Sequence, residues 1–324
     1  MSELEELETK ANSGDADAMF QLGVSYAFGR GAELDLKKAL DWLNKAAQAG
    51  HPTAGLVLQD IDQTMNASGC KPRSGGGGRC LSTGDTKTIP LPGGAEMEMI
   101  YCAPGSFMMG CPEYEYLWYM QNREYENIHK VILTKGFWLG KYPVTQAQWE
   151  IVMGSNPSTI NPYVNIGSNN PVVMISCNDC NNFIEKINVE YNLNARFPTE
   201  AEWEYACRAE SVEAYSGVGN LNDMGWYRDN SDFGIHPVGK KAPNNWGFYD
   251  MHGNVWEWCA DYLDKYPRRT VTDPIGIGTK YYRVFRGGGY SSDADECRSA
   301  SRKYDRPDSI DCEVGFRLCC SAES

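Results

Sequence analysis

Hydrophobic and polar positions follow two different patterns along the chain. Between Leu36 and Ala47 the apolar residues recur at the spacing that places them on one face of a helix. From Thr88 onward, short apolar runs such as residues 97–110 and 129–144 alternate with Gly, Pro and Asn, as strands alternate with turns. The pattern predicts a helical segment followed by a larger domain of strands and a few helices.

The helical segment, residues 1–65, contains an internal repeat. Residues 12–29 match residues 48–61 with a period of 36, so that Gly14 falls on Gly50 and Ala18 on Ala54. Such a period, with Gly at turns and small residues where helices meet, predicts helix–turn–helix units. The segment resembles the Sel1-like subclass of tetratricopeptide-type repeats. Because one repeat and a fraction cannot bury its own face, we expect it either to cap the main domain or to bind a second partner.

A linker separates this segment from the rest. Residues 66–87 include four successive glycines, which predict a flexible connection. In the domain that follows, residues 88–324, three helices are predicted. One begins after Thr145 as N-cap, one spans residues 178–191, and one begins at Thr199, which forms a capping box with Glu202.

Composition and charge narrow the function classes. The net charge of −13 argues against nucleic-acid and anionic-membrane partners, and no apolar run reaches the roughly 18 residues that span a bilayer. The acidic N-terminus contains no signal-peptide pattern, which predicts a cytoplasmic location, and the lack of heptads predicts a monomer. Cys177 and Cys180 form a CxxC without a second pair, so we favour buried thiols over a metal site.

Four blocks occur in a family-specific order: GFWLGKYPVTQAQWE, RFPTEAEWEYACRAE, HPVGKKAPNNWGFYDMHGNVWEWCADY, and RGGGY followed by GFRL. Together they resemble the formylglycine-generating-enzyme (sulfatase-modifying factor) domain. The resemblance implies an α+β, C-type-lectin-like fold with much irregular chain. In it Trp256 and Trp258 share a buried strand face, and Arg286 and Arg317 tie the C-terminal region, residues 286–318, to the core.

The same resemblance implies a structural calcium ion beside the tryptophan strand, and no other cofactor. Carried over residue by residue, the ligands would be the side chains of Asp250 and Glu257 and the carbonyls of Gly253 and Val255. Oxygen ligands of this kind suit calcium. The alternative is that Glu257 caps a loop without a metal.

The residues that would make the domain an enzyme are missing. Enzymes of this family bind copper through two cysteines a few residues after the Arg-Gly-Gly motif, and a cuprous ion requires soft thiolates. Here the corresponding positions hold Ser291 or Ser292 and Ala294, and the nearby Cys297 is offset. The alternative is that Cys312 approaches Cys297 and rebuilds a pair. An iron site of three histidines, as in the related sulfoxide synthases, would need an additional helical domain that this chain lacks.

The polar residues between the two ends of this region, residues 290–313 (hereafter the polar segment), resemble those of another group with this fold. These are the variable proteins of diversity-generating retroelements, in which mutagenesis at adenines rewrites a ligand-binding face. Most residues of the segment can arise from an Asn codon by adenine replacement, and no Asn follows Asn254. Glu296, Lys303 and Glu313 cannot arise in this way.

We therefore predict a non-catalytic protein that binds an unknown protein ligand, with basic groups, through the polar segment. A constant binding scaffold and a copper-dependent oxidase are the alternatives. The predicted ligand-binding positions are Tyr290, Ser291, Ser292, Asp293, Asp295, Glu296, Ser301, Lys303, Tyr304, Asp305, Arg306, Asp308, Ser309, Asp311, Cys312 and Glu313.

Overall fold

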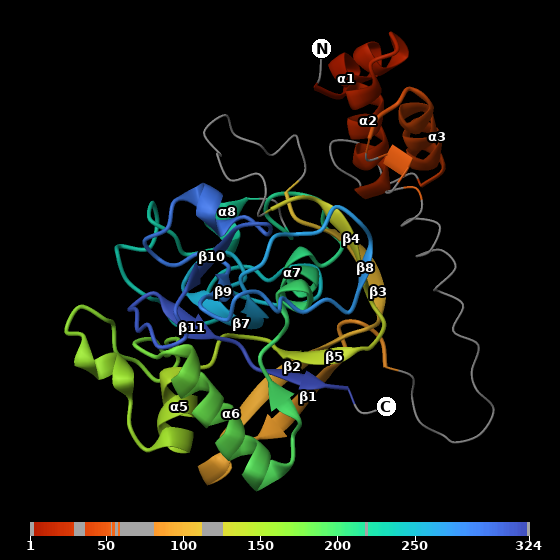
Figure 1. Cartoon of the computed structure of the whole chain (residues 1–324). Helices are drawn as coiled ribbons and strands as arrows, with labels where there is room; N and C mark the ends of the chain where they lie inside the picture. Colours follow the sequence, from red (N-terminus) through yellow and green to blue (C-terminus); the bar gives the residue numbers. More distant parts are fainter. Residues whose placement is uncertain are drawn as a thin grey trace. The chain divides into compact units, whose positions relative to one another are not determined.

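The computed structural model describes residues 3–28, 36–52, 54–55, 58, 81–111, 126–217 and 220–322. They belong to two compact units, Met1–Gly78 and Arg79–Ser324, shown in Figure 1. In the larger unit β1 begins at Thr86, so the predicted linker overlaps this strand by two residues. Residues 66–80 of that linker lie outside the described residues.

The smaller unit is helical, as its apolar spacing predicts. Its helices are α1 (Glu3–Asn12), α2 (Ala16–Phe28) and α3 (Leu36–Gln48). Gly23 shows why small residues recur here, because a Cβ at this position would lie 2.7 Å from Cγ of Leu43 on the facing helix. Close approach of α2 and α3 therefore requires glycine at position 23.

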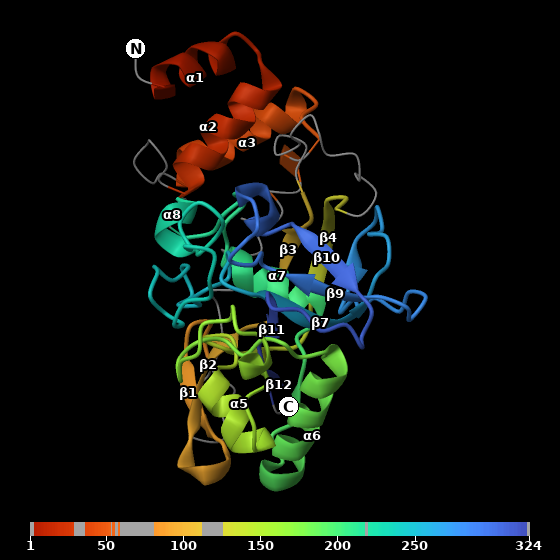
Figure 2. The ribbon, with the colours of Figure 1, turned by 90° about the vertical axis from the view of Figure 1, so that its left-hand side faces the viewer.

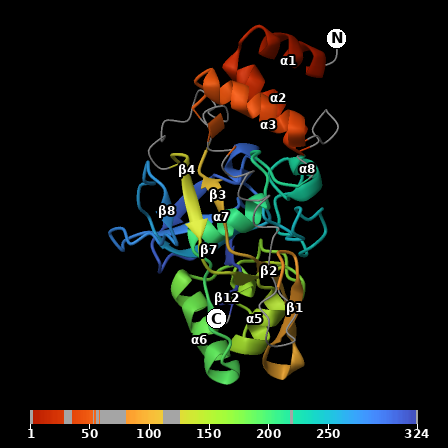
Figure 3. The same cartoon turned by 90° about the vertical axis from the view of Figure 1, so that its right-hand side faces the viewer.

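The larger unit contains three β-sheets. The five-stranded sheet has the order β1 (Thr86–Pro90), β2 (Glu96–Cys102), β5 (Phe137–Gly140), β12 (Cys319–Ser321), β6 (Ala195–Arg196). The four-stranded sheet has the order β10 (Arg302–Asp305), β9 (Arg283–Arg286), β7 (Trp256–Tyr262), β11 (Val314–Phe316). The three-stranded sheet, visible in Figure 3, has the order β3 (Gly105–Met109), β4 (His129–Leu133), β8 (Val271–Thr272).

Capping residues define the helices of this unit: α5 (Gln146–Met153), α6 (Cys177–Tyr191), α7 (Glu200–Arg208) and the short α8 (Leu221–Met224). Thr145, Ser176 and Thr199 each accept a hydrogen bond from the third residue of their helix, whose side chain bonds back to the cap. The predicted caps at Thr145 and Thr199 are confirmed, and α6 begins one residue earlier than predicted.

The five-stranded sheet carries a hydrophobic layer on each face. Met99 and Trp138 pack in one layer with α5 and α6, while Ile100 and Leu139 pack in the other layer with α7. Successive residues of β2 and β5 thus alternate between layers, as the period of a strand requires. The sheet is therefore a central partition, buried on both faces.

The cysteines follow the buried-thiol prediction. Cys177 and Cys180 lie in the first turn of α6 with no exposed surface, and burial raises the pKa of Cys177 to about 11. Among the residues that the structure describes, no group of three or more His, Cys, Asp or Glu is placed to hold a metal ion. In the same part of the chain, no helix is long and apolar enough to cross a membrane.

Candidate binding surface

The polar segment connects β9 to β11, two strands of the four-stranded sheet, which is visible in Figure 2. The chain leaves β9 at Arg286, and the polar segment that follows passes through a short 3₁₀ helix at Ala294–Cys297 and forms the edge strand β10 before β11 begins. Since β9 and β11 both pair with β7, the two ends of the segment are fixed to one strand.

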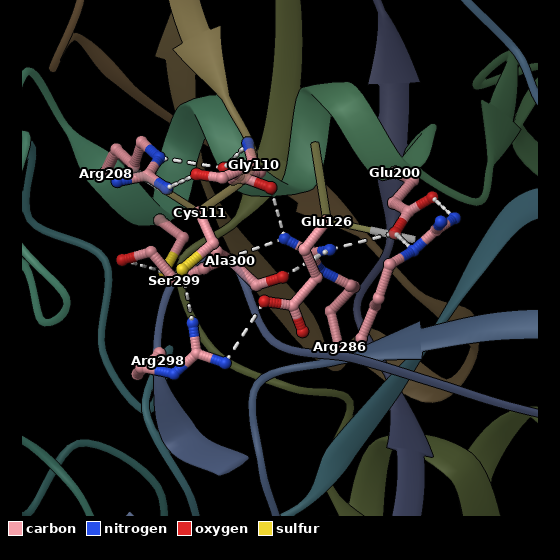
Figure 4. A network of polar contacts seen from close by, with 12 residues as sticks. Gly110, Cys111, Glu126, Glu200, Arg208, Arg286, Arg298, Ser299 and Ala300 are labelled. Carbon is pink, nitrogen blue, oxygen red and sulfur yellow. Dashed lines mark hydrogen bonds and ion pairs between the residues drawn. The ribbon is translucent and has the colours of Figure 1, made fainter. Parts of the chain in front are cut away.

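Arg286 fixes the first end through a buried network shown in Figure 4. Its guanidinium has no exposed surface, pairs with Glu200 at 2.8 Å and also pairs with Glu204. It donates further to the carbonyl oxygens of Ser299 at 2.6 Å and Ala300 at 3.4 Å. Arg286 therefore holds β9 and the interior of the polar segment to α7 at once.

The carboxylate of Glu204 is kept ionised by its neighbours. Burial raises the pKa of Glu204, but the guanidinium groups of Arg208 and Arg286 outweigh burial and leave that pKa below its ordinary value. Arg208 lies 2.8 Å from Glu204, and the backbone N–H of Gly110 donates to the same carboxylate at 2.9 Å. The negative charge of Glu204 is thus compensated by the two guanidinium groups that pair with it.

Two further arginines of the polar segment point inward. Arg302 forms two hydrogen bonds to Glu200, at 2.8 Å and 2.6 Å. Arg298 pairs with Glu126 at 3.1 Å and donates to Sγ of Cys111 at 3.3 Å, as Figure 4 shows. Because both arginine side chains pair inside the domain, their positive charges do not offset the acidic side chains on the outer surface of the segment. That surface is therefore more acidic than the sequence suggests.

Arg317 fixes the second end. It is fully buried and bonds Glu257 at 3.0 Å and 2.7 Å. It also donates to the carbonyls of Gly140 at 2.9 Å and Tyr249 at 2.8 Å. The prediction that Arg286 and Arg317 bind the C-terminal region to the core through buried hydrogen bonds is confirmed.

The predicted calcium ligands do not form a fitting donor set. Both oxygens of Glu257 already accept from Arg317, and Trp203 donates to one of them at 2.7 Å. The carbonyl of Gly253 accepts from the N–H of Val255 at 2.9 Å, and Asp250 accepts from Gly239 at 2.8 Å. A divalent cation here would displace hydrogen bonds and lie beside a buried guanidinium. Calcium stays a prediction of the sequence, and the ion pair favours the alternative without a metal.

Glycines let the backbone of the C-terminal region, residues 286–318, pass close to its neighbours. A Cβ at Gly315 would lie 2.7 Å from the carbonyl oxygen of Val172, and one at Gly287 would lie 3.1 Å from the ring of Trp203. Gly288 combines a left-handed φ of 83° with a contact in which a Cβ would overlap Cys297. Position 288 therefore excludes any side chain for two independent reasons.

Substitution of Gly288 by Ala is expected to lower the free energy of unfolding by about 2–4 kcal/mol, from left-handed strain and overpacking together. Gly84→Ala is the matched control. It has a φ of 91°, but no atom lies within 4 Å of an added Cβ, so only the backbone penalty applies. Denaturant unfolding of both variants checks this. Equal losses would show that the contact with Cys297 carries no cost.

The predicted binding positions divide by exposure. Those with open side chains are Asp293, Lys303, Tyr304, Asp305, Arg306, Asp308 and Asp311. Those that are half-buried are Tyr290, Ser291, Asp295, Glu296, Ser309, Cys312 and Glu313. The structure therefore places fourteen of the sixteen positions at the surface.

Ser292 and Ser301 are the corrections. Ser292 is 2% exposed, and its Oγ accepts hydrogen bonds from Nε1 of Trp256 at 3.1 Å and from the N–H of Gly289 at 3.0 Å. Ser301 is 7% exposed. Both belong to the frame, because a larger side chain at either position would enter the core. Sequence reasoning missed this because their type is the same as that of exposed serines.

The exposed bases are already matched with acids. Lys303 pairs with Glu296 at 2.6 Å and Arg306 with Asp308 at 2.8 Å. Arg228, outside the segment, pairs with Asp293. With Arg298 and Arg302 drawn inward, the seven acids between Asp293 and Glu313 face Lys303 and Arg306 alone within the segment. The surface of the segment therefore carries a surplus of acidic side chains.

The two cysteines of the region do not form a pair. Cys297 is fully buried beside Leu221 and Tyr227, and burial raises the pKa of its thiol. Cys312 packs in a different cluster and accepts a hydrogen bond from the hydroxyl of Tyr290 at 3.5 Å. Both thiols are unbonded to another sulfur. The alternative of a rebuilt pair is not supported.

A buried histidine contact was not found from the sequence. Nε2 of His252 accepts from the N–H of Ser216 at 3.0 Å, and the hydroxyl of Ser216 lies 2.8 Å from the same atom. Nδ1–H of His252 donates to the carbonyl of Cys297 at 2.8 Å. Both residues are at most 2% exposed, so this is a structural contact and not a serine nucleophile with its base.

His252 is expected to stay neutral well below neutral pH. Burial lowers its pKa from 6.5 to about 4. Below pH 6.5 the unfolded chain binds a proton that the folded chain does not, so the stability contributed by His252 falls as the pH drops from 6.5 towards 4. Nitrogen-15 shifts of the imidazole should report the Nδ1–H form from pH 8 to 5. Titration near pH 6.5 would contradict the buried contact.

A cavity of about 590 Å³ lies elsewhere, between residues 261–276, which include β8, and residues of β3, β4 and α7. Among the residues of the polar segment, only Arg302 reaches it. Asp261 lines it, and burial raises the pKa of this carboxyl group to about 7. No predicted binding position lines this cavity.

The sheets and the buried arginine frame define a C-type-lectin-like domain preceded by a helical repeat. Residues 87–322 match the family model of the sulfatase-modifying factor enzyme 1-like domain, and residues 16–51 match that of the Sel1 repeat. The chain belongs to the family of proteins that carry the sulfatase-modifying factor enzyme 1-like domain.

Curated relatives include formylglycine-generating enzymes. That of Mus musculus is 32% identical over 218 residues, which cover 61% of this chain and 54% of the relative. That of Thermomonospora curvata is 37% identical over 180 residues, which cover 48% of this chain and 56% of the relative. The chain spans about half the length of these curated relatives.

Two solved structures share the fold over most of the larger unit. Treponema denticola variable protein 1 has a TM-score of 0.65 and 27% identity, covering 73% of this chain and 99% of that chain. PvdO from Pseudomonas aeruginosa has a TM-score of 0.63 and 24% identity, covering 75% of this chain and 100% of that chain.

Proposed function

We propose that this chain is a non-catalytic ligand-binding protein, and that the surface positions of residues 290–313 form a diversified recognition surface. The observation that carries the proposal is the separation of two roles within one segment. Ser292, Arg298 and Ser301 are buried, while Asp293, Lys303 and Tyr304 beside them in the chain are exposed. The exposed side chains can change without altering the contacts that hold the fold.

The chemistry of the surface suits recognition. Tyr290 and Tyr304 supply rigid aromatic area, and serine and aspartate supply hydrogen bonds that adapt to different partners. The ion pairs of Lys303 and Arg306 are exposed, so a partner can exchange them at little cost. The likeness to Treponema denticola variable protein 1 supports the same reading.

The curated relatives favour a second candidate, an oxidase that generates formylglycine. The positions expected to carry its copper ligands argue against it here. Ser292 is buried and used as an acceptor by Trp256, and Cys297 is packed inside the domain. A cuprous site needs two thiolates, which this surface does not present.

Sequencing tests the diversified surface. DNA encoding residues 286–318 and its flanks would be read from a population of source cells. Substitutions should trace to adenines and cluster at the exposed positions, sparing Ser292 and Ser301. A single sequence throughout the population, with no near-copy repeat beside a reverse transcriptase, would remove diversification and leave a constant binding scaffold.

An activity assay tests the non-catalytic half. Copper(I) and a cysteine-containing peptide are added to the purified chain. We expect that the chain binds no stoichiometric copper and that the peptide is not converted to an aldehyde. Conversion of the peptide would restore the oxidase as the function. A Cys297→Ser variant then shows whether the buried thiol participates.

A further inference from the structure

Two loops outside the polar segment adjoin it and carry exposed apolar side chains. Figure 2 shows the loops 155–171 and 226–240 beside the sheet that bears β10 and β11. Tyr163 is 87% exposed and Phe233 is 71% exposed. Ile160 and Ile166 of the first loop are also exposed. Exposed apolar side chains that gather in one patch mark contact surfaces, whereas single scattered ones are normal.

Hydrogen bonds join the polar segment to the loop 226–240 and to the chain just after the loop 155–171. The hydroxyl of Ser231 donates to the carbonyl of Tyr290 at 2.7 Å, and the N–H of Arg228 donates to the carbonyl of Ser292 at 3.0 Å. Just after the other loop, the N–H of Met174 donates to the carbonyl of Asp311 at 2.9 Å. The second loop is therefore bonded directly to the polar segment, and the first is held beside it through the chain that follows.

The loops also hold each other. Nδ2 of Asn165 donates to the carbonyl of Ile235 at 3.1 Å, and a Cβ at Gly234 would lie 2.5 Å from that same nitrogen. Beneath them Val164 and Ile235 share a buried cluster against which Tyr290 and Cys312 pack. The exposed apolar side chains thus stand on rigid supports, which lowers the entropy lost on binding.

The backbone at Phe233 is strained. Asp232 and Phe233 adopt left-handed φ values of 51° and 55° in succession. Aspartate tolerates this conformation because its short polar side chain can hydrogen-bond locally, whereas the phenylalanine side chain has no polar group to do so. Strain that presents an aromatic ring to solvent is typical of functional positions.

Charge indicates what the patch contacts. No charged residue occurs between Gly154 and Asn178, whereas Asp229, Asp232 and Asp311 are exposed beside the patch. Apolar area with an acidic border fits a protein surface in which an aromatic or aliphatic side chain lies next to Lys or Arg. The same border disfavours an anionic membrane.

We propose that Ile160, Tyr163, Ile166 and Phe233 form a constant docking patch, which takes an apolar side chain of the same protein partner that the polar segment recognises. The inference rests on the proposed function. It divides recognition into a fixed part, which every partner must satisfy, and a changeable part, which selects among partners.

A display library of random linear peptides tests this. It is selected on the full chain and, separately, on the full chain carrying Tyr304→Ser, Arg306→Ser and Asp308→Tyr. The two selected pools should share an aromatic or aliphatic residue beside a base and differ elsewhere. The strongest peptide from each pool is resynthesised, and its affinity is measured by fluorescence polarisation.

Phe233→Asn and Tyr163→Ser should each weaken both peptides by about 30-fold, as loss of a central aromatic contact does. Asparagine is chosen at position 233 because it tolerates the left-handed backbone. Val189→Ser on α6 is the control, since Val189 is 89% exposed and lies near the far end of a helix whose first turn contacts Pro307. It should leave both affinities within twofold.

The outcomes separate the two proposals. One outcome contradicts the docking patch alone: the patch variants change neither affinity, while Tyr304→Ser abolishes binding of the peptide that was selected on the wild-type chain. The proposed recognition surface is then retained. If no peptide is enriched, or neither set of substitutions matters, both fail. Binding to phosphatidylcholine–phosphatidylserine vesicles that depends on Phe233 would replace the protein partner with a membrane.

Discussion

Replacing Arg317 by Met is expected to lower the free energy of unfolding of the lectin-like domain by about 3–5 kcal/mol. The guanidinium is fully buried and supplies two of the three hydrogen bonds that reach the carboxylate of Glu257. Methionine fills a similar volume but leaves that charge without a counter-ion. Two carbonyl oxygens, those of Gly140 and Tyr249, lose their donor as well.

Urea unfolding followed by tryptophan fluorescence measures the change. The matched control is Arg306→Met, whose guanidinium pairs with Asp308 at the surface. Exposed pairs of this kind are screened by solvent and contribute little to stability, so the control should unfold near the wild type. Equal stability of the two variants would mean that the buried pair of Arg317 and Glu257 does not hold the frame.

Arg286→Met is expected to have an effect at least as large, because two carboxylates and two carbonyl oxygens lose a donor together. Breaking one buried pair costs about 3–5 kcal/mol, a large part of the total stability of a domain. Since the carbonyls belong to Ser299 and Ala300, amide hydrogen exchange in the polar segment should accelerate along with global unfolding.

Arg228→Met is the control for Arg286. Arg228 also contacts the polar segment, through the carbonyl of Ser291 and the carboxylate of Asp293, but its side chain is half exposed. Its loss should leave the unfolding midpoint nearly unchanged and speed exchange only at its own contacts. Uniform exchange in both variants would assign the segment's order to its surface contacts instead of the buried frame.

Local signals were sufficient to predict part of this structure. The caps at Thr145 and Thr199 depend on residues three positions away, and the sequence displays them directly. The arginine frame was predicted from its place in the motif, but its partners were not. Glu257 lies 60 positions from Arg317 and Glu204 lies 82 positions from Arg286, so only the fold reveals the pairing.

The candidate surface shows the same limit. The sequence does not distinguish a serine that accepts a hydrogen bond from Trp256 in the core from a serine in solvent. The burial of Ser292 could therefore not be inferred. The exposed Tyr163 and Phe233 were missed because apolar residues in a polar loop suggest burial. Their position beside the polar segment depends on contacts between loops that the sequence separates.

The position of β12 has a consequence for how variants are screened in the cell. β12 follows the polar segment in the chain, yet it pairs with both β5 and β6 inside the five-stranded sheet. A ribosome must therefore translate the whole segment before the central sheet can close. A premature stop or a shifted reading frame within residues 290–313 removes β12, which opens one edge of β5 and takes the partner of β6 away, and chains with such open edges are targets of cellular proteases. A chain that ends within this region therefore cannot complete its central sheet, whatever side chains its exposed positions carry.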